Sequence, residues 1–411
     1  MPPERSTPAS PASAAPVSVL VVSHAVQVWG AQLRLLDLAP PLAERGVRLT
    51  LAADPASPVA RAWVARGLPL EPLVLPEHRS LRRPDGRRAG PGQLLSEARA
   101  VAVSAARVAR TARGFDVVLS FSLHAHLEVA LGARMARTPV VVEVVDIVAP
   151  GFGRRLLRAA SALATLTTAN SAATASTLGP RAADVVVVHP GVDVDRFSPG
   201  PADPEVRAAL GGVDGRPLVG IVGRVDPEKG VDVLARALAR ATGPAREARL
   251  AVVGDVAVGA ASSGAAVRAD AERLLGDRVR FVGRRDDVAA VHRALDVLVN
   301  ASVAEPFGRS VLEAMASGTP VVATRSGGIP EFVEDGVTGV LVPPGDDRAL
   351  AEALDRVLGD EALRHRLAEA ARASAVARLA LPGRYELVAD VFRRAAGHRG
   401  RHEGGWYSLS P

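Results

Sequence analysis

Short apolar runs rich in valine alternate along the chain with longer segments in which apolar residues recur at helical spacing. In the first half, the apolar runs cover residues 17–22, 47–53, 115–121 and 139–145. An uninterrupted apolar run is typical of a strand that is buried on both faces, and such strands form parallel sheets covered by helices. The pattern therefore predicts an α/β domain in this half of the chain.

The alternation stops over residues 189–217, where Pro, Gly and Asp are frequent, and this composition predicts a linker. The alternation then starts again, and the last ~60 residues follow a helical pattern. Strands are predicted within 217–224, 248–255, 278–283, 295–300, 319–324 and 338–343. We therefore expect an α/β protein with two doubly wound domains that face each other across a cleft.

The 411 residues exceed what one ordinary core holds. The expected parts are a Pro-, Ala- and Ser-rich tail (1–16), an N-terminal Rossmann-like domain (17–190), a linker (191–216), a C-terminal Rossmann-like domain (217–380), and a C-terminal helix and tail (381–411), the helix packing on the N-terminal domain. The first segment lacks the apolar run of a signal peptide, and no stretch reaches the ~20 apolar residues of a membrane helix. We therefore expect a cytoplasmic protein.

Composition limits the classes of function. The absence of cysteine excludes disulfides, thiolate nucleophiles and thiolate metal sites. The net charge of +6 suits an anionic substrate, an anionic membrane surface or nucleic acid, but only 3% of the residues are aromatic and no zinc spacing or recognition-helix motif is present. We expect no nucleic-acid partner. Two basic segments, 78–92 with its five arginines and 153–166, have two possible interpretations. Either they contact an anionic acceptor or an anionic membrane surface, or they belong to the ordinary solvated surface.

The stretch GRVDPEKG at 223–230 holds the first candidate chemistry. A buried strand ends at Gly223, Arg224 follows at its carboxyl edge, and Lys229 precedes a predicted helix. Lys229 is the only lysine among the 50 basic residues of the chain. Two cations beside a helix N-terminus, where free N–H groups already favour an anion, suit a diphosphate site. Taken alone, the segment is also compatible with a loop whose charges face water.

Two glutamates lie in the second candidate segment, 299–339. Pro306 and Gly308 fall between Glu305 and Glu313, so we place Glu305 in the loop after a strand and Glu313 inside the following helix. The glycine turn SGGIPE at 326–331 is expected to start another helix.

These motifs resemble the retaining, nucleotide-sugar-dependent glycosyltransferases of the GT-B fold, family 4 type, and the alanine- and arginine-rich composition is similar to that of actinobacterial members. The C-terminal half matches nearly end to end, and the N-terminal half, on the acceptor side, matches more loosely. The resemblance rests on GRVDPEKG, EPFGRSVLEAMASGTPVVAT, GGIPE, DGVTGVLVPPGD and, at the domain crossing, HPGVDVDRFSP.

The resemblance implies roles for individual residues. Arg224 and Lys229 are expected to hold the donor diphosphate, Glu313 the ribose hydroxyls and Glu305 the hydroxyls of the donor sugar. The other positions that the resemblance places along the donor are Gly30, Gly223, Val282, Arg284, Phe307, Gly308, Arg309 and Ser310.

The N-terminal half departs from the family pattern at several positions. Family members usually carry two glycines after the first strand, but here Trp29 stands in the first place and only Gly30 is retained. His124 is the favoured histidine for a catalytic contact with the donor. Asp146, Trp29 and His126 are assigned to the acceptor side, where Trp29 either lines the cleft or simply packs.

The sequence therefore predicts a retaining, metal-independent transfer of a sugar from a UDP-, GDP- or other nucleotide diphosphate sugar to a hydroxyl of a natural product, glycolipid or cell-envelope glycan. The Asp-x-Asp pair Asp193 and Asp195 lies in the linker, so we expect no metal there. A nucleotide-sugar epimerase, a phosphorylase and a non-catalytic nucleotide-sugar-binding protein stay open as alternatives. No dinucleotide-binding glycine motif follows residues 17–22 or 217–224, which argues against a nicotinamide enzyme.

Overall fold

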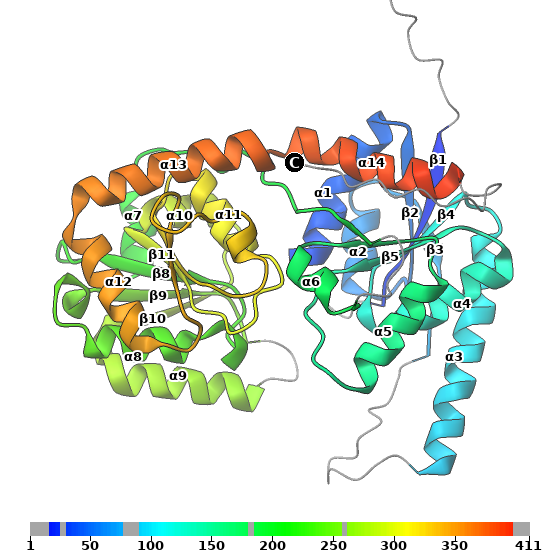
Figure 1. The fold of residues 1–411 in the computed structure, drawn as a ribbon, viewed down its shortest axis with the longest axis horizontal. Coiled ribbons are helices and arrows are strands. Elements are labelled where there is room, and N and C mark those ends of the chain that lie inside the picture. Colours follow the sequence, from blue (N-terminus) through cyan, green and yellow to red (C-terminus); the bar gives the residue numbers. More distant parts are fainter. Residues whose placement is uncertain (1–15, 25–29, 77–89, 180–184, 257–260, 398–411) are drawn as a thin grey trace, which may run out of the picture.

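Two lobes lie side by side in the computed structural model, and each contains a parallel sheet with helices on both faces (Figure 1). The expected α/β class with two doubly wound domains is confirmed. The structure describes residues 16–24, 30–76, 90–179, 185–256 and 261–397.

The N-terminal lobe has a seven-stranded sheet in the order β3-β2-β1-β4-β5-β6-β7. Its strands are β1 (Val17–Val22), β2 (Val47–Ala53), β3 (Leu70–Pro72), β4 (Val117–Ser120), β5 (Val140–Val144), β6 (Leu166–Ala169) and β7 (Val185–Val187). Its helices are α1 (Gly30–Glu44), α2 (Pro58–Val64), α3 (Pro91–Ala112), α4 (His126–Ala136), α5 (Phe152–Leu163) and α6 (Ala172–Ser176).

The C-terminal lobe has a six-stranded sheet in the order β10-β9-β8-β11-β12-β13. Its strands are β8 (Leu218–Val222), β9 (Arg249–Val253), β10 (Val279–Gly283), β11 (Val297–Asn300), β12 (Val321–Thr324) and β13 (Val340–Val342). Its helices are α7 (Pro204–Ala209), α8 (Val231–Arg240), α9 (Ala261–Leu275), α10 (Val288–Ala294), α11 (Arg309–Ala316) and α12 (Asp347–Gly359).

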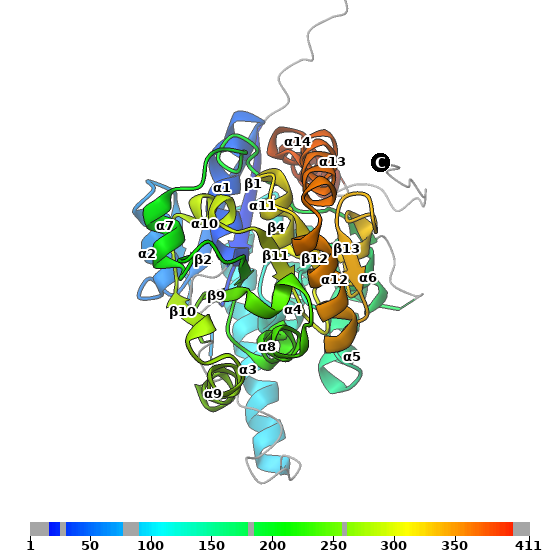
Figure 2. The same ribbon diagram turned by 90° about the vertical axis from the view of Figure 1, so that its left-hand side faces the viewer.

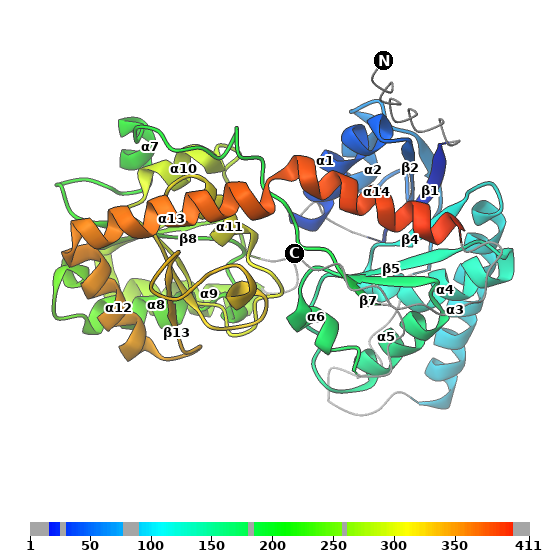
Figure 3. The same cartoon turned by 45° about the horizontal axis from the view of Figure 1, so that its top comes forward.

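Two consecutive helices, α13 (Glu361–Leu379) and α14 (Leu381–Gly397), connect the lobes along one side of the molecule (Figures 1 and 3). In the end-on view of Figure 2, the two helices overlap at the top of the molecule. The Val192 N–H bonds to the carbonyl of Leu379, so the forward and return crossings of the chain run beside each other. Helix α14 buries Ala389 and Phe392 in the core under α1 of the N-terminal lobe. The last helix therefore belongs structurally to the first lobe.

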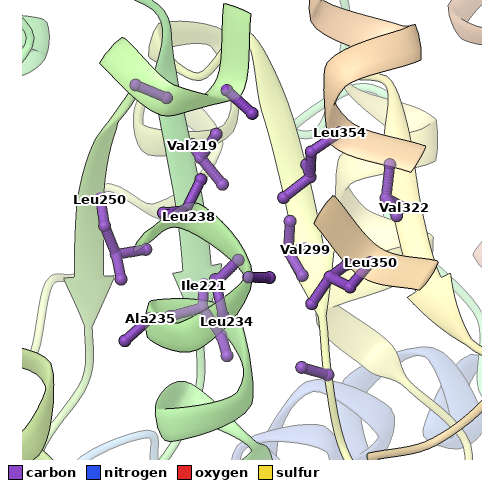
Figure 4. Packing of buried hydrophobic residues seen from close by; sticks show 14 of the residues in the cluster. Val219, Ile221, Leu234, Ala235, Leu238, Leu250, Val299, Val322, Leu350 and Leu354 are labelled. Atoms are coloured by element: carbon purple, nitrogen blue, oxygen red, sulfur yellow. The ribbon is translucent and has the colours of Figure 1, made fainter. Parts of the chain in front are cut away.

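Both cores follow from the strand sequences, because successive side chains of a strand point to opposite faces of its sheet. In β1, Val19 and Val21 join the cluster under α1 and α14, while Leu20 and Val22 join the cluster under α3 and α4. Figure 4 shows the equivalent packing of β8 against α8 and α12 in the C-terminal lobe.

Two local expectations differ from the structure. The Pro- and Gly-rich linker contains helix α7, which Asp203 caps by accepting bonds from two N–H groups, and Leu210 behind it is fully buried. The SGGIPE turn forms only a 3-10 turn at Ile329–Glu331 rather than a helix. In the described part of the chain, no helix is both long and apolar enough to span a membrane.

Candidate active site

The candidate residues follow the carboxyl ends of the parallel strands, where ligands bind in doubly wound sheets. Arg224 and Lys229 follow β8 in the C-terminal lobe, whereas His124 and Asp146 follow β4 and β5 in the N-terminal lobe. The charges of Arg224, Lys229 and His124 all act on the Asp146 carboxylate, so the four side chains lie near one another between the lobes.

A tight turn fixes the backbone of Lys229. The Asp226 carboxylate accepts a bond from the Lys229 N–H at 3.1 Å and caps a 3-10 turn over Pro227–Lys229. Gly230 follows with φ +69°, and a Cβ at this position would lie 2.2 Å from the carbonyl oxygen of Ala301. Only glycine lets the β8 loop approach the β11 loop this closely.

Lys229 pairs with the buried Glu305 in this structure. The distance from Lys229 Nζ to Glu305 Oε2 is 2.8 Å, and the same oxygen accepts bonds from Asn300 Nδ2 at 3.1 Å and Ser302 Oγ at 2.8 Å. Burial opposes ionisation of Glu305, but the lysine and the two hydrogen bonds outweigh it, so the pKa of Glu305 lies below its usual value. Glu305 is therefore held as a carboxylate.

Glu313 lies in α11, one turn after Arg309. Its Oε1 accepts from Arg309 Nη2 at 3.2 Å, and its Oε2 lies 3.8 Å from Nε2 of the fully buried His292. Burial opposes ionisation here too, but the neighbouring His292, Arg309 and Arg196 outweigh it and lower the pKa of Glu313.

The segment between the two glutamates is packed from both lobes. Phe307 is buried and stacks on His189 at a ring-centroid distance of 5.6 Å and on Phe332 at 4.7 Å. Gly308 has φ +101° and directly precedes α11, so the backbone of Arg309 and Ser310 forms the first turn of this helix. The N-terminal turn of a helix carries the positive end of the helix dipole and favours an anion.

Histidine and aspartate define the N-terminal side of the cleft. His124 is exposed, while its neighbour His126 is buried and its Nδ1 lies 2.7 Å from Ser120 Oγ. Desolvation by burial and the nearby His124 lower the pKa of His126 to about 3. The expectation that His126 lies on the acceptor surface is therefore wrong, because α4 turns its neutral ring into the core. Asp146 is exposed at the cleft, yet the protein atoms around it partly desolvate its carboxylate and raise its pKa.

The remaining predicted site residues lie at the ends of strands, at the start of a helix, or outside the described residues. Gly223, Val282 and Arg284 lie at or just beyond the carboxyl ends of β8 and β10, and Arg284 N donates to Asp255 Oδ1 at 3.2 Å. Helix α1 begins at Gly30, whereas Trp29 and most of the arginine-rich stretch lie outside the described residues.

The Asp-x-Asp pair takes part in a local turn, since Asp193 Oδ1 accepts from the backbone N–H groups of Asp195 and Arg196. Across the described ranges, the His, Asp and Glu side chains form no group of three or more that is arranged to hold a metal ion.

One contact between the lobes was not predicted. Glu331 accepts bonds from the N–H groups of Ala172 and Ala173, at 2.9 and 3.0 Å, and its Oε2 lies 2.8 Å from His189 Nε2. Beside it, Ser171 Oγ donates to the carbonyl of Pro306 at 2.6 Å. Both His189 and Glu331 belong to quoted family motifs, but their pairing depends on how the lobes dock.

Comparison with protein families assigns each half of the chain. Residues 203–374 match the model described as glycosyl transferases group 1, and residues 28–196 match glycosyltransferase family 4.

This chain matches two named relatives over only part of each relative's length. The D-inositol 3-phosphate glycosyltransferase of Mycolicibacterium smegmatis is 40% identical over 178 residues, which are 43% of this chain and 40% of that protein. The protein of the same name from Corynebacterium jeikeium is 36% identical over 229 residues, 53% of this chain and 54% of that protein. The match thus spans about half the length of these relatives or less.

Solved structures resemble the chain over nearly its whole length. The Anabaena protein Alr3699/HepE, solved in complex with UDP and glucose, has a TM-score of 0.76 and 29% sequence identity, over 92% of this chain and 99% of that one. Sucrose-phosphate synthase from Thermosynechococcus elongatus shares the fold, with a TM-score of 0.72 and 22% identity over 93% of this chain and 100% of that one.

Proposed function

We propose that this chain, which belongs to the group 1 glycosyltransferases of the GT-B fold, transfers a sugar from a nucleotide diphosphate sugar to a hydroxyl acceptor and retains the anomeric configuration. The observation that carries the proposal is the Lys229–Glu305 pair beside Arg224, facing Asp146 of the other lobe. Relatives named as glycosyltransferases, and the Anabaena protein that binds UDP and glucose, support it.

The chemistry of the leaving group explains the two cations. In the proposed reaction, the bond between C1 of the sugar and the β-phosphate oxygen breaks, and the acceptor oxygen bonds to C1 on the same face. The acceptor hydroxyl gives its proton to the departing phosphate. Negative charge grows on the diphosphate in an oxocarbenium-like transition state, and the fixed charges of Arg224 and Lys229 lower the barrier. The proposed reaction needs no divalent metal, since these two cations neutralise the leaving group.

Lys229 is suited to a double contact. An ammonium group has three N–H donors, and Glu305 Oε2 engages one of them in this structure. The other two are left for phosphate oxygens of the donor. Glu305 keeps acceptor positions for the hydroxyls of the sugar, so one ion pair positions the sugar next to its leaving group.

Each lobe has a separate task in this proposal. Glu313 accepts bonds from the ribose hydroxyls of the donor, and the first turn of α11, with Arg309 and Ser310, lies along the phosphates. In the N-terminal lobe, His124 contacts the donor sugar and Asp146 orients the acceptor hydroxyl.

Incubation of the full chain with UDP-glucose and GDP-mannose, with and without a panel of hydroxyl acceptors that includes inositol phosphates, tests the proposal. We expect nucleoside diphosphate to be released in step with a new α-glycoside. NMR reads its configuration from the H1–H2 coupling of a glucoside and from the one-bond C1–H1 coupling of a mannoside. A β-linked product refutes retention. Epimerised donor or sugar 1-phosphate indicates one of the other enzyme classes, and tight nucleotide binding without turnover indicates a binding protein.

A further inference from the structure

His292 is a buried imidazole without a hydrogen-bond partner. It lies in the last turn of α10 and is fully buried, and neither ring nitrogen has a hydrogen-bond partner among the described residues. A buried polar group without a partner destabilises the folded state, so its presence in a native structure calls for an explanation. Its surroundings therefore indicate what the ring does.

The polar group that His292 faces is the Glu313 carboxylate. Nε2 of the ring lies 3.8 Å from Glu313 Oε2, slightly too far for a hydrogen bond. The ring also packs against Phe197, at a centroid distance of 6.1 Å, and the backbone carbonyl of His292 accepts a bond from Thr319 Oγ1 at 2.8 Å. The imidazole therefore has a fixed place directly behind Glu313.

We propose that His292 is a positioning residue that donates its Nε2–H to Glu313 Oε2 and so orients this carboxylate toward the ribose of the nucleotide. This inference rests on the proposed function, in which Glu313 binds the ribose hydroxyls. A movement of less than 1 Å brings the two atoms within hydrogen-bond distance.

The geometry leaves room for the ligand. Glu313 Oε1 already accepts from Arg309, and Oε2 faces His292. A carboxylate has about four acceptor positions, so two remain for the two hydroxyls of a ribose. The lowered pKa of Glu313 agrees with a ring that favours the ionised carboxylate. Without the ring, the carboxylate is held on one side only and is free to turn away from the ribose.

The test compares a nucleotide with its analogue that lacks both ribose hydroxyls. UDP and 2′,3′-dideoxy-UDP are titrated calorimetrically into the wild type, His292→Phe and His292→Gln, with the ADP and GDP pairs run in parallel to cover the choice of base. Phenylalanine keeps the packing against Phe197 but removes the donor, whereas the glutamine amide places a donor close to the position of Nε2. His126→Leu, which removes a buried imidazole from the other lobe, is the matched control.

We expect the preference of the wild type for UDP over the dideoxy analogue to fall on the order of 10-fold in His292→Phe, the usual effect of one hydrogen bond to a charged group. The affinity for the dideoxy analogue should change less than about 2-fold in the same variant. His292→Gln should recover most of the preference, and His126→Leu should keep all of it.

An unchanged preference in His292→Phe overturns the assignment, and so does an equal loss for both nucleotides, which indicates a purely structural role. If the wild type binds none of the nucleotides, the proposed function itself fails. If it binds them and Glu313→Gln shows no loss of ribose preference, the premise about Glu313 fails while a nucleotide site remains.

Discussion

Removing Lys229 tests the centre of the proposed site. Its Nζ lies 2.8 Å from Glu305 Oε2, and the two side chains are 21% and 9% exposed. At an effective dielectric constant of ~20, charges this close attract by about 6 kcal/mol, and desolvation cancels most of this gain. Since Asn300 and Ser302 continue to bond Glu305, we expect Lys229→Ala to lower the free energy of unfolding by about 2 kcal/mol, less than the ~3–5 kcal/mol of an uncompensated buried charge.

This stability effect has a defined pH dependence. The folded-state pKa of Glu305 lies below its usual value, so its stabilisation is present above the unfolded-state pKa of about 4.3 and is lost as the pH falls through the folded-state value. Without Lys229, the desolvation of the buried carboxylate is opposed only by the hydrogen bonds, and the pKa of Glu305 rises. We therefore expect the free energies of unfolding of the wild type and Lys229→Ala, measured in urea, to differ more at pH 7 than at pH 4.

Activity gives the second measurement. Loss of one transition-state charge contact costs about 2–4 kcal/mol, so we expect kcat/KM of Lys229→Ala to fall roughly 30- to 1000-fold. Lys229→Arg should lose ~10-fold or more, since a planar guanidinium does not replace a compact ammonium between Glu305 and a diphosphate. Arg348→Ala, which removes an exposed cation at the surface of helix α12, is the matched control and should keep full activity. A fully active Lys229→Arg enzyme refutes this reasoning.

Three further substitutions test other parts of the structure. Glu331→Gln should lower the free energy of unfolding by about 1–2 kcal/mol at pH 7, and the difference should shrink below pH ~4 because its imidazole and amide donors depress the pKa of Glu331 against the effect of burial. His126 should contribute a loss of about 2 kcal/mol to the wild type's free energy of unfolding between pH 7 and pH 5, because the unfolded chain protonates His126 while the folded one, with a pKa of about 3, does not. The His126→Leu variant should lack this loss in urea titrations at the two pH values. Gly230→Ala should destabilise the fold by at least ~3 kcal/mol. In thermal or urea unfolding, Gly46→Ala, at φ +75° with no atom near its Cβ, should lose only ~1 kcal/mol.

Continuous apolar runs made most of the sheet predictable from the sequence. The three strands that the pattern missed, β3, β6 and β7, differ from the others in composition or length. Strand β6 reads LTTA, and its Thr167 is buried only because Ser161 of α5 supplies a hydroxyl partner at 2.8 Å. Strands β3 and β7 span only three residues each, Leu70–Pro72 and Val185–Val187. Tertiary contacts decide such strands, so periodicity alone does not reveal them.

Local motifs identified the charged residues of the site but not their partners. Glu313 was expected inside a helix and Glu305 in the preceding loop, and the structure has both there. His292 lies on the apolar face of α10, where a histidine in the sequence looks like any core residue. The two histidines at 124 and 126 were both assigned to the cleft, but the short 3-10 turn at Leu123–Ala125 leaves one exposed and turns the other inward.

The pairing of Lys229 with Glu305, 76 residues apart, follows from the strand order rather than from any local signal. In the order β10-β9-β8-β11-β12-β13, strand β8 has β9 on one side and β11 on the other, and this is the point at which the order reverses. The helices that follow two such strands lie on opposite faces of the sheet, and the loops that lead to them border a common crevice. The β8 loop bears Arg224 and Lys229, and the β11 loop bears Glu305. Because the first and fourth strands of a doubly wound sheet are adjacent in this way, counting strands from the domain crossing is enough to predict that the two loops meet.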